Sequence, residues 1–105
     1  MRALGNIAET KACKYLIKND FDILERNFYS RFGELDIIAF KNNILHFVEV
    51  KSGQYNPIEN ITSSKIKKLI KTIDFYLNTK KLNFDYCLDA IIVTDKIEFI
   101  ENITL

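Results

Sequence analysis

The stretch GELDIIAFKNNILHFVEVK, residues 33–51, decides the fold of this chain. It contains two apolar runs, 34–40 and 44–51, separated by the turn-prone pair Asn42-Asn43. Apolar runs of this length joined by a short turn are typical of antiparallel strands. A third run of the same kind, Ile23–Ser30, comes just before them, so the pattern predicts a meander of three antiparallel strands.

Two segments outside the meander have the periodicity of helices. From Ala3 to about Asn19 the apolar positions recur every three or four residues. The same spacing recurs in the second half of the chain, at Ile66, Leu69, Ile70, Ile73, Tyr76 and Leu77. The second helix is predicted to have its cap at Thr62 or Ser63. A start at Asn56 is the alternative, and it would give an unusually long helix.

The last quarter of the chain predicts two more strands. The dense apolar run Cys87–Thr94 indicates a central strand, and a last strand is predicted from Ile97 to about Ile103. The expected order is helix, three-strand antiparallel meander, helix and two strands, which is a mixed α/β sheet. A chain of 105 residues is long enough for one domain and too short for two, so we expect a single domain over 1–105.

The composition is that of a globular protein without a membrane span. Apolar residues make up 48% of the chain and charged residues 28%, which excludes a disordered chain. The longest stretches free of charged residues have seven residues each, whereas a membrane helix needs about 20. Glu9 and Lys11 interrupt the first apolar stretch, which argues against a secretory signal. Because the two cysteines show no CxxC spacing, we expect a reduced, cytoplasmic protein.

Acidic residues occupy strand positions that should be apolar. Side chains alternate between the two faces of a strand, so Glu49 and Lys51 share a face with Phe47. In the preceding strand, Asp36 shares a face with Ile38, and Glu34 lies on that face as well. Unpaired charges are very costly to bury. A cross-strand salt bridge would explain any one of these acids alone, but two adjacent strands with the same anomaly need a common explanation.

The first helix adds a third acid to this set. Glu9 lies at the edge of the apolar stripe, so a helix packed on the sheet could aim it toward Asp36 and Glu49. Three carboxylates on rigid elements predict a site for Mg²⁺ or Mn²⁺, ions that bind carboxylate and phosphate oxygens. Such an ion activates water and stabilises a leaving oxygen. Lys51 would hold or deprotonate that water, or neutralise the phosphorane.

Two segments of the sequence resemble a known family. The segments GELDIIA, 33–39, and FVEVK, 47–51, resemble the core of the PD-(D/E)XK nuclease superfamily. More closely, the chain is similar to the YraN-like family of small bacterial proteins, which are described as predicted endonucleases akin to archaeal Holliday-junction resolvases. The resemblance covers nearly the whole chain. Weaker matches lie in the opening helix (Gly5, Ala8, Glu9, Ala12, Tyr15 and Leu16), the first strand (Leu24 to Asn27), the second helix (Lys65, Tyr76 and Leu77) and the pair Leu88-Asp89.

The resemblance implies a restriction-endonuclease-like fold and a set of roles. Asp36 and Glu49 would be metal ligands together with the backbone carbonyl of Val50. Lys51 would be the catalytic lysine, and Glu9 would be a further acid at the site, as in the resolvase-like branch. The chain departs from the family pattern at Ala8, Ile73 and Gly53. Gly53 replaces a usual Arg, which removes an expected phosphate contact.

The small net charge of +1 conceals a basic helix. Segment 65–81 carries +5, whereas 21–64 carries −2 and 82–105 carries −4. A charge run on a helix is either a solvated face or a phosphate contact, and the sequence leaves both readings open. The candidates for phosphate contact are Lys65, Lys67, Lys68 and Lys71, with Lys65 the strongest.

The remaining reactive side chains are interpreted as structural. His46 is the only histidine, and alternation places it on the face opposite to Glu49. Cys13 and Cys87 are expected to be small buried or half-buried groups rather than nucleophiles.

Two functions remain open from the sequence. The first is metal-dependent hydrolysis of DNA, branched or single-stranded, by an endonuclease. The alternative is a nuclease-like module that binds nucleic acid or a partner protein and cuts little by itself. The resolvase resemblance also raises the option of a homodimer.

Overall fold

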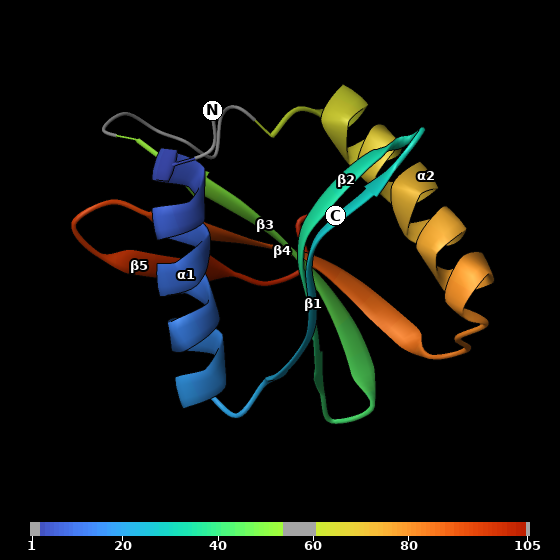
Figure 1. The fold of residues 1–105 in the computed structure, drawn as a ribbon, viewed down its shortest axis with the longest axis horizontal. Helices are drawn as coiled ribbons and strands as arrows, with labels where there is room; N and C mark the ends of the chain where they lie inside the picture. The colour runs from blue at the N-terminus through green and yellow to red at the C-terminus, as the bar shows by residue number, and fades with distance from the viewer. Residues whose placement is uncertain (1–2, 54–60, 105) are drawn as a thin grey trace.

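A computed structural model describes residues 3–53 and 61–104 of the chain. The helices are α1 (Ala3–Lys18) and α2 (Ser63–Lys80), and the strands are β1 (Asp22–Ser30), β2 (Gly33–Lys41), β3 (Ile44–Ser52), β4 (Asp85–Val93) and β5 (Ile97–Ile100). Together the strands form one sheet in the order β1-β2-β3-β4-β5. The β3–β4 pair is parallel and the other pairs are antiparallel, with α2 as the crossover (Figure 1). This confirms the predicted element order and the mixed α/β class.

Local signals predicted most of the boundaries. Thr62 is the N-cap of α2, and its side chain accepts a hydrogen bond from Lys65 N, as the sequence predicts. The alternative start at Asn56 lies outside the described residues. The last strand ends at Ile100 rather than Ile103, because Asn102 adopts a left-handed conformation with φ 57° and donates its N–H to Asp89. The chain therefore leaves the ladder at that point.

Each helix covers its own cluster of buried side chains. The α1 cluster contains Ala12 and Leu16 of the helix together with Val48 and Ile91 of the sheet. The α2 cluster contains Ile73 and Tyr76 of the helix, and its strand members are Leu35, Ile38, Leu45, Phe47 and Leu88. Neighbouring β3 residues such as Phe47 and Val48 thus contribute to opposite clusters, as strand alternation requires. No helix in the described part of the chain is long and apolar enough to cross a membrane.

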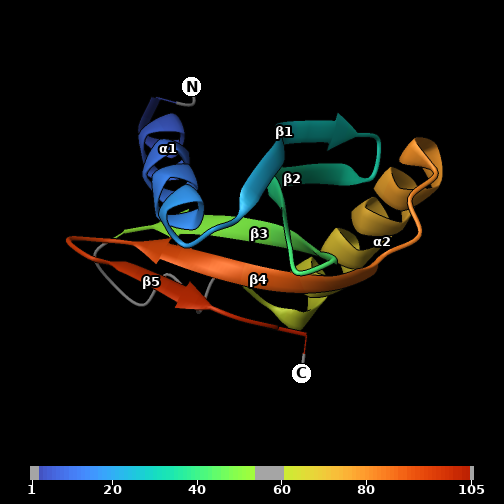
Figure 2. The ribbon, with the colours of Figure 1, turned by 90° about the horizontal axis from the view of Figure 1, so that it is seen from below.

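The β1–β2 hairpin separates from the rest of the sheet. The β2–β3 ladder runs only as far as Ile37 and Val48, and Figure 2 shows the hairpin rising away from β3 and β4 between the two helices. Leu35 packs in the α2 cluster, although strict alternation would place it with Ile37 in the other one. The strand therefore twists sharply around Asp36. This separation positions the candidate site.

Gly33 lets the tip of this hairpin approach α2. Its φ of 146° is strained for residues with a Cβ, and a Cβ there would lie 3.2 Å from Thr72 Oγ1. The hairpin and the helix therefore meet closely where β2 begins.

Candidate active site

Asp36 and Glu49 meet where β2 and β3 separate. Their carboxyl groups are hydrogen-bonded to each other, and Asp36 Oδ2 accepts a second hydrogen bond from Val50 N at 2.9 Å. The Asp36 side chain therefore lies between the strands rather than on the face expected from alternation. Two carboxyl groups can share a hydrogen bond only when one of them holds a proton. A cation between them would serve the same purpose, which is to offset the repulsion of two negative charges.

The electrostatics of this pair are unusual for acids. Burial and then the charge of Asp36 raise the pKa of Glu49 from 4.5 to about 8. Burial also raises the pKa of Asp36; the Val50 N–H opposes that shift and Glu9 adds to it. Acids whose pKa values are raised by burial and by each other are typical of functional sites.

Lys51 is the nearest cation to this pair on β3. Its Nζ lies 3.9 Å from Glu49 Oε1, and both side chains are partly exposed. Its charge lowers the pKa of Glu49, against the larger effects of burial and Asp36. The lysine is therefore close enough to act on anything that Glu49 binds, and it remains accessible to solvent.

The Val50 backbone faces the same gap between the strands. The N–H and C=O groups of one residue in an extended strand point to the same side. Because the Val50 N–H points to Asp36, its carbonyl oxygen is directed to that side as well. This is the orientation that a backbone ligand beside Asp36 and Glu49 requires.

A cavity of about 260 Å³ opens beside Glu49 and Lys51. Its wall includes Glu34 from β2 and Lys65 and Lys68 from α2. The described wall is completed by Phe32, Gly33, Ile61, Leu69 and Thr72. Two carboxylates and three lysines therefore meet around one space, so both a cation and a phosphate would find partners there.

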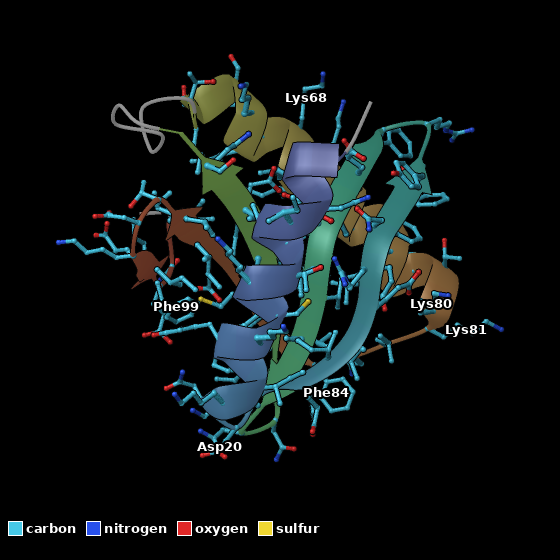
Figure 3. The ribbon with its side chains drawn as sticks, turned by 60° about the vertical axis from the view of Figure 1, so that its left-hand side comes forward. Asp20, Lys68, Lys80, Lys81, Phe84 and Phe99 are labelled. Atoms are coloured by element: carbon cyan, nitrogen blue, oxygen red, sulfur yellow. The ribbon has the colours of Figure 1, made fainter. Side chains whose placement is uncertain are left out.

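The four predicted phosphate-contacting lysines divide into two pairs. Lys65 and Lys68 line the cavity, whereas Lys67 and Lys71 are not among its described wall residues. Figure 3 shows Lys68 in the first half of α2, with Lys80 and Lys81 at the far end of the helix. The basic helix thus presents only part of its charge to the candidate site.

Glu9 is buried in α1 and lies beside Arg26 of β1. Its Oε1 is 3.8 Å from Arg26 Nη2, which also donates a hydrogen bond to Thr10 Oγ1 at 3.3 Å. Glu9 is near enough to Asp36 to raise the pKa of that acid. The three carboxylates do not, however, form a cluster of mutually close ligand atoms. Among the described residues the only such group, with all atoms within 4.8 Å, is a different one.

That different group is His46, Cys87 and Asp89, on the other side of β3. His46 Nδ1 lies 2.6 Å from Asp89 Oδ2, and Cys87 Sγ donates to Asp89 Oδ1 at 3.0 Å. His46 is interpreted from the sequence as structural and placed on the face opposite to Glu49, and the structure shows it 5% exposed and in contact with Phe21. Sequence reasoning did not connect the three residues. A signal was present, because Asp89 is a lone acid in the apolar run Cys87–Thr94.

The donor set beside the cavity fits a hard divalent cation. Asp36, Glu49 and the Val50 carbonyl offer oxygen atoms only, which Mg²⁺ and Mn²⁺ prefer. Burial and mutual repulsion raise the pKa of both acids, and a cation bound between them would offset that repulsion. These residues would hold the ion, and the remaining positions would be left to water and substrate oxygen.

Comparison with known proteins identifies close relatives over the full domain. The family described as "Uncharacterised protein family UPF0102" matches residues 8–93. A UPF0102 protein of Helicobacter hepaticus is 58% identical over 106 residues, covering 99% of this chain and 96% of the relative. One from Helicobacter pylori is 55% identical, covering 98% and 92%, and one from Sulfurimonas denitrificans is 55% identical, covering 99% and 98%.

Proposed function

The chain belongs to the UPF0102 family, and on that premise we propose that it is a metal-dependent endonuclease that hydrolyses phosphodiester bonds in DNA. One observation carries the proposal. Glu49 and Lys51 line the same cavity as Lys65 and Lys68, with Asp36 hydrogen-bonded to Glu49. The proposed cation ligands and the proposed phosphate-binding lysines thus surround one space. The resemblance of the two β-strand motifs to PD-(D/E)XK nucleases and archaeal resolvases supports the same reaction.

The side chains divide the work of in-line hydrolysis. Asp36 and Glu49, with the Val50 carbonyl, would hold Mg²⁺ or Mn²⁺, which supplies an acidified water and charge stabilisation for the leaving oxygen. Lys51, 3.9 Å from Glu49, would orient the attacking water or neutralise the phosphorane. Lys65 and Lys68, across the cavity, would bind the backbone phosphates that flank the scissile bond. Glu9 would act on the site through its charge on Asp36.

The setting of the activity follows from the same residues. Free Cys13 and Cys87 favour a reducing cytoplasm. The small net charge of +1 favours weak or transient binding to nucleic acid, and the resemblance to archaeal resolvases supports branched or single-stranded DNA as the substrate. A four-way junction presents two symmetric strands, and a homodimer or a partner protein would let both be cut.

The direct test is cleavage of labelled DNA. Single-stranded, duplex and four-way-junction substrates are incubated with the protein in Mn²⁺, Mg²⁺ or EDTA. We expect cleavage of at least one substrate with metal and none with EDTA. Asp36→Asn and Lys51→Ala should each reduce the rate by about 100-fold or more, because each removes a group at the reacting phosphate. Lys96→Ala, in the exposed β4–β5 turn, is the matched control and should leave the rate unchanged.

Two results would overturn this assignment. One is the absence of metal-dependent cleavage on all three substrates, and the other is equal cleavage by the wild type and the Asp36→Asn and Lys51→Ala variants. If DNA binds without being cut, and the binding weakens steeply with salt, the chain is instead a nuclease-like binding module. Gly53, in place of the usual Arg, is the observation that favours this second function.

A further inference from the structure

A second group of ligand side chains lies on the α1 side of the sheet. His46 comes from β3, and Cys87 and Asp89 come from β4. The parallel register pairs His46 with Cys87 and Val48 with Asp89, so the three side chains project to the same face. One potential ligand atom from each residue lies within 4.8 Å of the other two. Residues from distant parts of the sequence are thus assembled by the β3–β4 pairing shown in Figure 2.

This group is independent of the proposed nuclease site. Glu49 faces the α2-side cavity, whereas His46 lines a different cavity of about 260 Å³ with Tyr15, Phe21, Phe99 and Glu101. The sheet therefore separates the two places. The second cavity gives a solvent ion a route to the imidazole, and Glu101 adds a carboxylate to its wall.

The surroundings hold the three side chains in place. Asp89 is completely buried, and its Oδ1 also accepts the N–H of Asn102 at 2.8 Å. The Phe21 ring and the His46 imidazole pack nearly perpendicular to each other, with 5.0 Å between the ring centres. In the described part of the chain, no lysine or arginine forms an ion pair with Asp89. Lys41 is a cation in the wall of the cavity beside His46, and its Nζ lies 4.9 Å from the centre of the Phe21 ring.

We propose that His46, Cys87 and Asp89 bind a zinc-class divalent cation. An imidazole nitrogen, a thiolate sulfur and a carboxylate oxygen are the three donor types found at protein zinc sites, and a sulfur donor disfavours Mg²⁺ and Mn²⁺. Tetrahedral zinc holds its donors about 3.3–3.6 Å apart. The His46–Asp89 and Cys87–Asp89 distances of 2.6 and 3.0 Å would therefore widen by about 1 Å or less. A water or Glu101 in the adjoining cavity would complete the four ligands.

Binding of the cation requires the release of the Cys87 thiol proton. The Cys87 thiol gives up its proton to solvent, and His46 binds as the neutral tautomer with its other nitrogen protonated. The hydrogen bonds from Cys87 and His46 to Asp89 are replaced by bonds to the metal, while the Asn102 N–H still holds the carboxylate. The bound ion would tie β3, β4 and the C-terminal segment together, so it should stabilise the fold.

Cobalt is the most direct probe of this site. Co²⁺ is added to metal-free protein, and the near-ultraviolet absorption of a thiolate–cobalt bond is followed together with displacement of Co²⁺ by Zn²⁺. We expect one ion per chain, a thiolate band, and a higher melting temperature with Zn²⁺. Cys87→Ser keeps a hydroxyl that can donate to Asp89, so its fold should survive. It should lose the band and weaken Zn²⁺ binding by about 10-fold or more.

Controls separate this site from the other sulfur and from the nuclease site. Cys13→Ser, at a buried cysteine in the α1 cluster, should retain the band. The double variant Asp36→Asn/Glu49→Gln should retain it as well, which keeps the outcome independent of DNA cleavage. If the wild type shows no thiolate band, or if Zn²⁺ binds Cys87→Ser as tightly as the wild type, the proposal is overturned. The three residues would then be a hydrogen-bonded network only.

Discussion

Two groups of buried or half-buried carboxylates flank β3, and their hydrogen bonding differs. On the α1 side, Asp89 receives donors from His46, Cys87 and the Asn102 N–H. On the α2 side, the Asp36–Glu49 pair contains two acids that share a hydrogen bond, with the Val50 N–H as a donor to Asp36. Asp89 thus accepts three hydrogen bonds, whereas Asp36 and Glu49 lie side by side although their negative charges would repel each other.

This difference indicates which side of the strand is arranged for stability and which for chemistry. A buried acid with three donors stabilises the arrangement that surrounds it. A pair of acids that cannot both ionise costs stability unless a proton or a cation joins them. Local conflicts of this kind are expected at functional sites, where stability is given up for activity. The difference in hydrogen bonding therefore supports the proposed catalytic role of Asp36 and Glu49.

The largest effect is expected from removing the two acids one at a time. Asp89→Ala leaves the buried His46, the half-buried Cys87 and the Asn102 N–H without their acceptor, so the free energy of unfolding should fall by about 3 kcal/mol. Asp36→Ala removes the acceptor of the Val50 N–H but also removes the repulsion with Glu49, so its loss should be about 1 kcal/mol or less. Urea denaturation in EDTA measures both values. Equal losses would show that the two sides do not differ as the hydrogen bonds indicate.

The pH dependence of stability should come from the Asp36–Glu49 side. The pKa of Glu49 is about 8 in the folded chain, above its ordinary 4.5. The folded chain therefore keeps a proton that the unfolded chain releases. The resulting stabilisation is fully present below about pH 4.5 and is lost as the pH rises through 8. Between pH 6 and 8.5 the free energy of unfolding should fall by roughly 2–3 kcal/mol from this group.

Glu49→Gln is the matched variant for this measurement. Its amide does not titrate, so the decline between pH 6 and 8.5 should be largely abolished in urea melts run in EDTA. Manganese should bind the wild type more tightly as the pH approaches 8, since the ion competes with the shared proton. A wild type whose stability is flat over this range would contradict the raised pKa.

Local sequence signals predicted the elements that carry both groups. The Thr62 cap, the Asn42-Asn43 turn and the apolar spacing of the helices act over a few residues, and each is found in the structure. Asp36, Glu49 and Lys51 attracted attention because charges in apolar strands are costly. Their predicted roles remain predictions, but the structure does bring Asp36 to Glu49 and Lys51 close to it.

Features that depend on distant residues were not predictable in the same way. Alternation assigned Asp36 to a face of β2, whereas the separation of the hairpin turns its carboxyl toward Val50 of β3. The group around Asp89 depends on the parallel register of β3 and β4, which only the long crossover through α2 establishes. His46 and Cys87 are ordinary core residues until that register is known.

The proposed nuclease side of β3 faces α2, and the four α2 lysines predicted to contact phosphate differ in their position relative to the cavity. Lys65 and Lys68 line it with Glu49, and Lys67 and Lys71 are absent from its described wall. Lys65→Ala/Lys68→Ala should weaken DNA binding by about 10-fold, because each lysine that neutralises a phosphate strengthens binding. Lys67→Ala/Lys71→Ala carries the same change of charge and should weaken binding by about 2-fold. Fluorescence anisotropy with a labelled junction at fixed salt measures both.

The two double variants distinguish phosphate binding at the cavity from binding along the whole basic face of α2. If the two double variants weaken binding equally, the basic helix acts as a diffuse positive face and the cavity has no special part in binding. If only the Lys65/Lys68 pair matters, the phosphate is bound where Glu49 and Lys51 are. That result would extend the functional side of the comparison from β3 to α2.

The smallest effect is expected at Glu9, which shares properties with both groups of acids. It is buried beside Arg26 at 3.8 Å, as a structural acid would be, and yet its charge reaches Asp36. Glu9→Gln keeps the shape of the side chain and removes that charge. If Glu9 acts only through its electrostatic field, metal-dependent cleavage should change by less than about 10-fold, and Mn²⁺ affinity should fall slightly because one attractive charge is removed.

Arg26→Gln is the paired control, since it removes the neighbouring cation and should shift Mn²⁺ affinity in the opposite direction. A loss in Glu9→Gln as large as that in Asp36→Asn would instead make Glu9 a ligand, and the ion would then have to draw α1 toward β2 and β3 when it binds.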